Sequence, residues 1–354
     1  MKNNGVLPLK NNLKKYFVTG PNASNIDVLI GNYYGVSSKM VTILEGLAGQ
    51  VEPGSQITYR KGILLDRNNV NPIDWTTGEA KEANATIAVL GISGLLEGEE
   101  GESIASSSAG DRLDYNLPKN QIDFLRKLKN NNKNPVIAVI TGGSPMNLTE
   151  VQEIADAVLL VWYPGEEGGN ALANIIFGKV SPSGRLPITF PRSLDQLPPY
   201  EDYTMKGRTY RYMSAVPLYP FGFGLSYTTF SYKNLKLSKS SISKNEPVEA
   251  EVTVTNTGNF KSDEVVQLYI THEGSGTDAP LYSLKGFKRI SLAPGASRIV
   301  HFSLTPESLS VINDNGQMVQ PSDEVWIRIG GSLPSKRSME LGASQYAEIK
   351  LQVK

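Results

Sequence analysis

Cysteine is absent from the 354-residue sequence, and histidine occurs only twice, as His272 and His301. The absence of cysteine excludes disulfide frameworks, thiolate metal sites and cysteine nucleophiles. Two isolated histidines are poor candidates for a metal site, so none is predicted. A Ser–His–acid triad would have to use one of them. His301 lies in RIVHFSL, whose alternation is typical of a strand, and a structural role is expected for it.

Long apolar runs and an excess of charge of one sign are also missing. No run of about 18 apolar residues exists, so no membrane-spanning helix is predicted. The opening residues, MKNNGV, contain no apolar core, so no signal peptide is predicted on this chain. The 35 basic and 35 acidic residues form no long block of one sign, which argues against nucleic-acid partners. No P-loop or G-x-G-x-x-G motif opens a helix, and no cofactor is predicted.

The first half of the chain alternates short apolar segments with helical patterns. The apolar segments span residues 14–20, 85–91, 134–143 and 156–165. Their continuous apolar character is typical of strands that are covered on both faces. The alternation predicts an α/β sandwich with a mainly parallel sheet.

Three segments between these strands have helical spacing: 37–49, 117–131 and 167–179. The first is expected to begin at a serine cap and to stop at Gly49. The second has Pro118 near its start, and the third ends at Gly178. The expected buried faces are Met40, Leu44 and Leu47 in the first, Ile122, Leu125 and Leu128 in the second, and Leu172, Ile175 and Ile176 in the third.

The second half has the texture of an all-β domain. Residues 191–233 are rich in proline and aromatic side chains and are predicted to form a linker after a first domain over 1–190. Beyond it, alternating segments recur at regular spacing, beginning with PVEAEVTVTNTG. We expect a β-sandwich of about seven strands over 234–354.

An acidic stretch, GLLEGEEGESIASSSAGDR, follows the predicted strand 85–91 and spans residues 94–112. Ligands of open α/β sheets collect at the carboxyl ends of strands, which is where this stretch lies. A carboxyl group crowded by other carboxylates holds its proton more readily, which suits a general acid. A solvated acidic loop is the competing interpretation, and the residue pattern alone favours it, because acidic Gly/Ser loops are common.

Two glycine-rich turns are alternative candidates for a site. GGSPM, over 142–146, lacks the final glycine of a nucleophile elbow. PGEEGG, over 164–169, leads into a predicted helix and could offer backbone N–H groups to an anion. An ordinary strand-to-helix turn is the favoured interpretation of PGEEGG.

Several long motifs, in this order, resemble the C-terminal part of glycoside hydrolase family three, the β-glucosidase and β-xylosidase family. They are NNGVLPLKNNLKKYFVTGPNA, GNYYGVSSKMVTILEGL, WYPGEEGGNALANIIFGKVSPSGRLPITFP, LYPFGFGLSYTTF, VTNTGNFKSDEVVQLYI and LKGFKRISLAPGAS. The resemblance covers about residues 3–335 and implies that the second domain is a fibronectin type III-like β-sandwich. It also implies retaining hydrolysis of terminal β-D-glycosides in β-linked oligosaccharides or other glycosides.

The resemblance implies a catalytic acid/base glutamate in the acidic stretch. Glu97 matches the family by its position after the strand, whereas Glu100 matches by its distance back from Gly110-Asp111-Arg112. We expect the acid/base to be Glu97, with Glu100 and Glu99 as alternatives. Asn32, Tyr33 and Tyr34 are candidates for the border of the sugar site.

The nucleophile of the family is an aspartate on an N-terminal (β/α)₈ barrel, for which about 250 residues are typical. No stretch here supplies eight such units, so a barrel partner is expected in cis or in trans. The PIDW sequence at 72–75 resembles the nucleophile motif, but it lies before strand 85–91, and Asp74 and Trp75 are expected to be loop residues. A catalytically silent carbohydrate-binding or scaffolding module is the alternative function.

Overall fold

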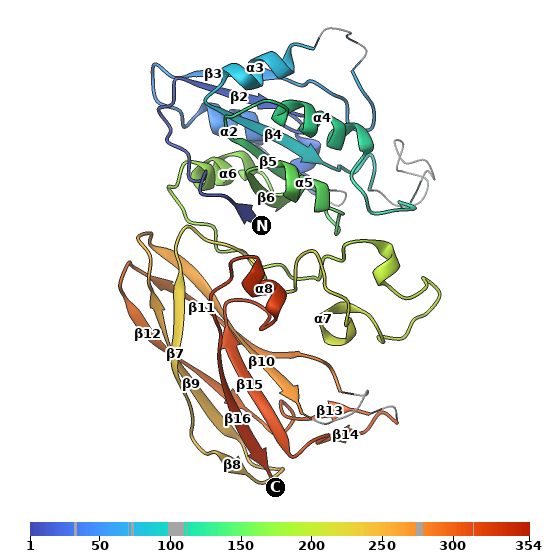
Figure 1. The fold of residues 1–354 in the computed structure, drawn as a ribbon, viewed down its shortest axis with the longest axis vertical. Helices are drawn as coiled ribbons and strands as arrows, with labels where there is room; N and C mark the ends of the chain where they lie inside the picture. Colours follow the sequence, from blue (N-terminus) through green and yellow to red (C-terminus); the bar gives the residue numbers. More distant parts are fainter. Residues whose placement is uncertain are drawn as a thin grey trace. The chain divides into compact units, whose positions relative to one another are not determined.

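The computed structural model describes residues 1–31, 34–69, 71, 74–97, 110, 112–273, 279–313 and 315–354. The chain divides into two compact units (Figure 1). Unit 1 comprises Met1–Val180 and Arg192–Leu194, and unit 2 comprises Ser181–Pro191 and Asp195–Lys354. Within the described ranges, every helix is too short or too polar to cross a membrane.

Unit 1 is built on a six-stranded sheet with the order β1-β6-β5-β4-β2-β3. The strands are β1 (Lys2–Asn3), β2 (Lys15–Thr19), β3 (Gln56–Arg60), β4 (Ala85–Gly91), β5 (Val136–Thr141) and β6 (Ala157–Trp162). All neighbours pair in parallel except β1, which pairs antiparallel with β6. Strands β4 and β5 are buried at every position, as their continuous apolar sequences predict.

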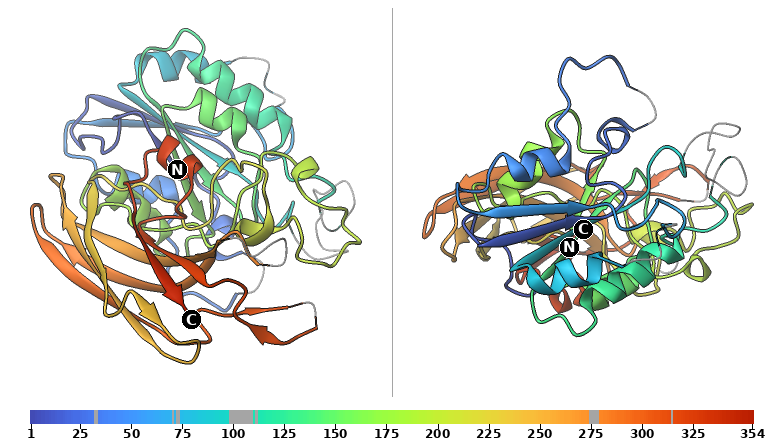
Figure 2. Two further views of the ribbon diagram at one scale, coloured as in Figure 1. Left: turned by 60° about the horizontal axis from the view of Figure 1, so that its bottom comes forward. Right: turned by 90° about the horizontal axis from the view of Figure 1, so that it is seen from above.

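Helices cover both faces of this sheet. They are α1 (Asp27–Ile30), α2 (Ile43–Ala48), α3 (Thr76–Glu82), α4 (Lys119–Lys129), α5 (Thr149–Ile154) and α6 (Gly168–Ile176). The right-hand view of Figure 2 shows α2 and α6 on one face and α3 and α4 on the other. The predicted α/β sandwich with a mainly parallel sheet is therefore confirmed.

The helix expected over 37–49 is shorter than its sequence pattern suggests. It begins only at Ile43, where Thr42 is the N-cap and forms a capping box with Glu45. A capping box satisfies two backbone N–H groups at once and fixes the start of a helix. The expected serine cap is therefore wrong, and Met40 lies outside the helix. Gly49 ends the helix as predicted.

The other two helices bury most of the predicted faces. In α4, Ile122, Leu125 and Leu128 are all buried. In α6, Leu172 and Ile176 are buried, whereas Ile175 is only partly covered.

Helices α2 and α6 approach each other closely at two glycines. A Cβ atom added to Gly46 would lie 2.1 Å from the carbonyl carbon of Gly169, and one added to Gly169 would lie 2.0 Å from the carbonyl oxygen of Thr42. Only glycine fits at either position, because backbone atoms cannot move aside. The glycines therefore determine the distance between the two helices on this face of the sheet.

Unit 2 is a β-sandwich of two sheets, with the strand orders β11-β10-β15-β16-β8 and β12-β9-β7 in its described residues. The strands are β7 (Phe230–Leu237), β8 (Ser241–Ile242), β9 (Val248–Asn256), β10 (Ser262–His272), β11 (Ser283–Leu292), β12 (Ser297–Leu304), β15 (Glu324–Gly330) and β16 (Ala347–Val353). A hairpin of β13 (Val311–Ile312) and β14 (Met318–Val319), and the short helices α7 (Thr209–Tyr212) and α8 (Lys336–Glu340), complete it. In β9, every second residue is buried, as the sequence alternation predicts.

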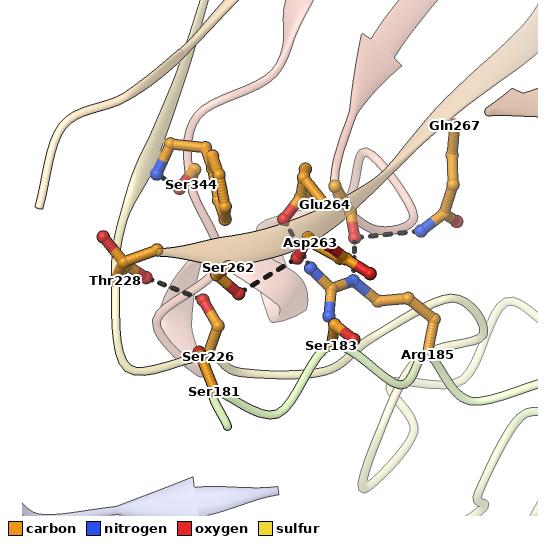
Figure 3. Close-up of polar contacts among 12 residues, drawn as sticks. Ser181, Ser183, Arg185, Ser226, Thr228, Ser262, Asp263, Glu264, Gln267 and Ser344 are labelled. Atoms are coloured by element: carbon orange, nitrogen blue, oxygen red, sulfur yellow. Dashed lines mark hydrogen bonds and ion pairs between the residues drawn. The ribbon is translucent and has the colours of Figure 1, made fainter. Parts of the chain in front are cut away.

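A buried ion pair joins residues 181–191 to strand β10 within unit 2. Figure 3 shows Arg185 directed toward Glu264, and the distance between Nη2 and Oε2 is 2.7 Å. The other carboxylate oxygen of Glu264 accepts a hydrogen bond from the Tyr232 hydroxyl, and Nε of Arg185 donates to the carbonyl of Gly331. Both charges are thus hydrogen-bonded where water is largely excluded, which a buried ion pair requires.

Candidate active site

Three neighbouring parallel strands of unit 1 end at the same edge of the sheet. Strand β5 pairs with β4 on one side and with β6 on the other. The residues that follow their carboxyl ends are Glu97 after β4, Gly143 after β5 and Tyr163 after β6. This is the edge where open α/β sheets bind their ligands.

The carboxylate of Glu97 accepts hydrogen bonds from two residues that follow strands β5 and β6. Its Oε2 accepts a hydrogen bond of 2.7 Å from the backbone N–H of Gly143 and one of 2.8 Å from the hydroxyl of Tyr163. A single turn precedes it, because the N–H groups of Leu96 and Glu97 both donate to the carbonyl of buried Ser93. This turn directs Glu97 toward β5 and β6.

A bulge at the end of β6 aims the side chain of Tyr163. Ile140 pairs with Leu160, but the next residue of β5, Thr141, pairs with Trp162, so one residue of β6 is skipped. Trp162 has φ = 56°, in the left-handed region that a bulky side chain rarely adopts. Bulges of this kind change the direction of a side chain next to functional sites.

The phenol of Tyr163 is protonated over the whole physiological range. Burial raises its pKa, and the nearby Glu97 carboxylate raises it further, while Arg112 opposes the rise. A neutral phenol keeps its O–H proton and therefore remains a hydrogen-bond donor to Glu97.

Gly143 is small where a larger residue would disturb this contact. A Cβ atom there would lie 3.0 Å from Cε2 of Tyr163 and 3.3 Å from Oε2 of Glu97. The GGSPM turn therefore forms one wall of the site and supplies a backbone donor. This role differs from that of a nucleophile elbow.

Arg112 binds the same turn as Glu97 does. Its Nη2 donates to Oγ of Ser144 at 3.1 Å and to the carbonyl of Pro145 at 3.3 Å. Glu97 and Arg112 thus bind two adjacent residues of one turn, Gly143 and Ser144. The predicted alternatives Glu99 and Glu100 lie outside the described residues.

The candidate sugar-site residues are only partly described. Asn32 and Tyr33 fall outside the described residues, and Tyr34 is 63% exposed. The segment that carries them starts beside the site, because a Cβ atom on Gly31 would lie 3.0 Å from Cδ2 of Tyr163. The sequence pattern did not single out Tyr163, although the WYPGEEGG motif contains it.

Asp74 has a structural role at the start of helix α3. Its carboxylate accepts hydrogen bonds from the backbone N–H and hydroxyl groups of both Thr76 and Thr77, at the start of helix α3. Partial burial alone would raise the pKa of Asp74, but these hydrogen bonds outweigh it and lower the pKa. Trp75 is exposed, with the guanidinium of Arg60 5.8 Å from its ring centroid.

The remaining candidates from the sequence, which are the PGEEGG turn and the two histidines, have structural surroundings. In the PGEEGG turn, the N–H groups of Gly165, Gly168 and Gly169 donate to backbone carbonyls of the protein, so they are not directed at a ligand. His272 is buried in β10, where burial lowers its pKa to about 4. His301 lies in the other sheet of unit 2, with Nδ1 3.7 Å from the carboxylate of Glu251.

Comparison with known proteins identifies the family. Residues 1–227 match the family model described as the glycosyl hydrolase family 3 C-terminal domain. The chain belongs to glycosyl hydrolase family 3. Residues 264–333 match a fibronectin type III-like domain, which confirms the predicted character of the second sandwich.

The family 3 chain is similar to curated xylosidases and glucosidases. It is 36% identical over 341 residues to a β-xylosidase of Formosa agariphila, covering 93% of this chain and 46% of the relative. It is 34% identical over 341 residues to a periplasmic β-glucosidase of Salmonella typhimurium, covering 87% of this chain and 43% of the relative. The chain therefore spans about half the length of these relatives.

Solved structures agree in fold over the whole chain. A β-glucosidase from Erythrobacter marinus has a TM-score of 0.82 at 29% identity, covering 100% of this chain and 48% of that one. A family 3 exo-β-xylosidase in complex with a xylobiose aziridine probe has a TM-score of 0.83 at 25% identity, covering 100% and 46%.

Proposed function

We propose that this family 3 chain is the C-terminal portion of a retaining β-glycosidase that acts on terminal β-D-glucosides or β-D-xylosides. The β-xylosidase and β-glucosidase among its relatives support this substrate class. The observation that carries the proposal is the Glu97 carboxylate, held by Tyr163 and Gly143 at the carboxyl ends of β4, β5 and β6.

In the proposed reaction, Glu97 is the acid/base. A retaining glycosidase uses two carboxyl groups about 5–5.5 Å apart, one as acid/base and one as nucleophile. Glu97 protonates the glycosidic oxygen as the bond to the leaving group breaks. In the second step it removes a proton from the water that attacks the glycosyl-enzyme. Only two carboxyl groups and water take part, and no cofactor is needed.

The nucleophile comes from an N-terminal (β/α)₈ barrel, joined in cis or supplied in trans. Most of the groups that bind the sugar lie on the same barrel. Asn32, Tyr33 and Tyr34 border the sugar from this chain, since their segment starts beside Tyr163. Without the barrel the chain has half of an active site and is inactive.

The proposal is tested in a reconstituted enzyme, which we define as this chain fused to, or co-expressed with, a family 3 barrel domain. An acid is needed only for poor leaving groups. Glu97→Ala should therefore slow disaccharide hydrolysis by about 10²–10⁴-fold and leave dinitrophenyl glycosides much less affected. Azide needs no general base, so it should rescue the variant and give a β-glycosyl azide.

Glu99→Ala and Glu100→Ala are the matched controls, because they remove neighbouring carboxylates of the same stretch. Both should cost much less and yield no azide product. If Glu100→Ala or Glu99→Ala shows leaving-group dependence and azide rescue while Glu97→Ala is nearly normal, the acid/base is not Glu97. If none of Glu97, Glu99, Glu100 and Glu102 responds to the same change, the stretch is a solvated loop, which favours the alternative of a binding or scaffolding module.

A further inference from the structure

We infer that Tyr163 is a positioning residue, which fixes the carboxylate of Glu97 in the orientation that proton transfer requires. The inference rests on the proposed function and goes beyond it, because it assigns a catalytic consequence to a residue that does not itself exchange a proton with the substrate. Its basis is the geometry around Oε2 of Glu97.

The Tyr163 hydroxyl and the Gly143 N–H converge on the same carboxylate oxygen, at 2.8 and 2.7 Å. Hydrogen bonds to a charged acceptor are roughly twice as strong as neutral ones. Two such bonds, from the segments that follow β5 and β6, limit the rotation of the Glu97 side chain. A catalytic group must be held within about 0.5 Å of its productive place, and supporting residues with locked rotamers do this.

Tyr163 is itself held firmly. The bulge at Trp162 sets the direction of its backbone. Gly31 and Gly143 both lie against the Cδ2–Cε2 edge of its ring. A Cβ atom on Gly31 would lie 3.0 Å from Cδ2 of the ring, and one on Gly143 would lie 3.0 Å from Cε2. The hydroxyl therefore approaches Glu97 from a ring that its surroundings confine.

The contact itself is tested in the chain as it exists, by a double-mutant cycle on thermal unfolding. Tyr163→Phe removes only the hydroxyl. It should lower the melting temperature of the otherwise unchanged chain more than it lowers that of the Glu97→Ala chain. Equal shifts in both backgrounds would mean that the two side chains do not interact in solution, and would overturn the inference.

The catalytic consequence is tested in the reconstituted enzyme. Tyr163→Phe should lower kcat for a disaccharide by about 10–100-fold, because a misplaced catalytic group of this kind costs up to about 10²-fold. The loss should be under about threefold with a dinitrophenyl glycoside, which needs no acid. Gly143→Ala keeps the phenol but places a Cβ atom 3.0 Å from its ring and 3.3 Å from Oε2 of Glu97. It should therefore show the same contrast between the two substrates.

Tyr16→Phe is the control for a loss that is merely structural. Tyr16 is fully buried in β2, and its hydroxyl accepts a hydrogen bond of 2.8 Å from the N–H of Leu13. It should change both substrates equally or not at all. If Tyr163→Phe behaves like Tyr16→Phe while Glu97→Ala shows leaving-group dependence and azide rescue, the inference fails and the proposed function stands. If Glu97→Ala shows neither, both fail together.

Discussion

Glu97 and Arg112 bind adjacent residues of one turn: Glu97 accepts a hydrogen bond from Gly143 at 2.7 Å, and Arg112 donates one to Ser144 at 3.1 Å. Both residues belong to the acidic stretch 94–112, which resembles the family's acid/base segment. Two of its residues, one near each end, are thus bound to the turn that follows β5. The proposed acid therefore lies at the carboxyl ends of the strands, which is the edge where open α/β sheets bind their ligands.

The isolated chain is expected to hydrolyse neither nitrophenyl β-glucoside nor nitrophenyl β-xyloside. The physical reason is that the proposed nucleophile belongs to a barrel domain, and loss of a catalytic carboxylate leaves only the residual contributions of binding and positioning. Release of nitrophenol should be measured beside the Glu97→Ala chain purified in the same way. Turnover well above that control would contradict the need for a barrel.

Removing one partner of the buried ion pair in unit 2 should destabilise the protein strongly. Arg185→Met leaves Glu264, whose side chain is 2% exposed, without its cation, which typically costs about 3–5 kcal/mol. Urea unfolding measures this free energy. Lys119→Met is the control, because the Lys119–Asp123 pair is exposed and such pairs contribute little to stability. A similar small loss for both variants would refute the special role of the buried pair.

Loss of the Asp74 carboxylate should reduce stability in a pH-dependent way. The pKa of Asp74 is lowered in the folded state, so its contribution is present above the unfolded value of about 4 and is lost as the pH falls through the folded pKa. Asp74→Ala should therefore cost about 0.5–2 kcal/mol at pH 7, as expected for a lost cap, and less at pH 3.

Urea unfolding of the unchanged chain and of the Asp74→Ala chain, at pH 7 and at pH 3, measures this loss in the free energy of unfolding. Glu153→Ala, which removes an exposed carboxylate from helix α5, should cost little at either pH. In the reconstituted enzyme, Asp74→Ala should retain activity, because Asp74 caps a helix. If Asp74→Ala instead abolishes activity, forms no glycosyl-enzyme and is not rescued by azide, Asp74 is a nucleophile.

Two glycine-to-alanine changes in helices should have opposite effects. Gly46→Ala places a Cβ atom 2.1 Å from backbone atoms of Gly169, and overpacking of this kind costs about 1–3 kcal/mol or more. In α3, a Cβ atom on Gly78 meets nothing within 4 Å, so Gly78→Ala should stabilise the protein by about 0.4–1 kcal/mol. Melting temperatures of the two variants should move in opposite directions. A rise for Gly46→Ala would show that α2 and α6 can separate at little cost.

The sequence by itself determined the identity of most elements and the family. Continuous apolar segments predicted β4 and β5, because a strand that is buried on both faces is apolar at every position. Strict alternation predicted β9, because a strand that is buried on one face is apolar at every second position. The acidic stretch could also be placed after β4, since its position depends only on the chain order.

The tertiary structure decided what the acidic stretch contacts and where one helix begins. Thr42, and not an earlier serine, caps α2, because the partner Glu45 completes the capping box there. Tyr163 lies 66 residues from Glu97, and no local pattern connects them. They meet because β4, β5 and β6 are neighbours in the sheet and because a bulge turns the end of β6. Strand order and bulges follow from packing between distant segments, which the periodicity of neighbouring residues does not record.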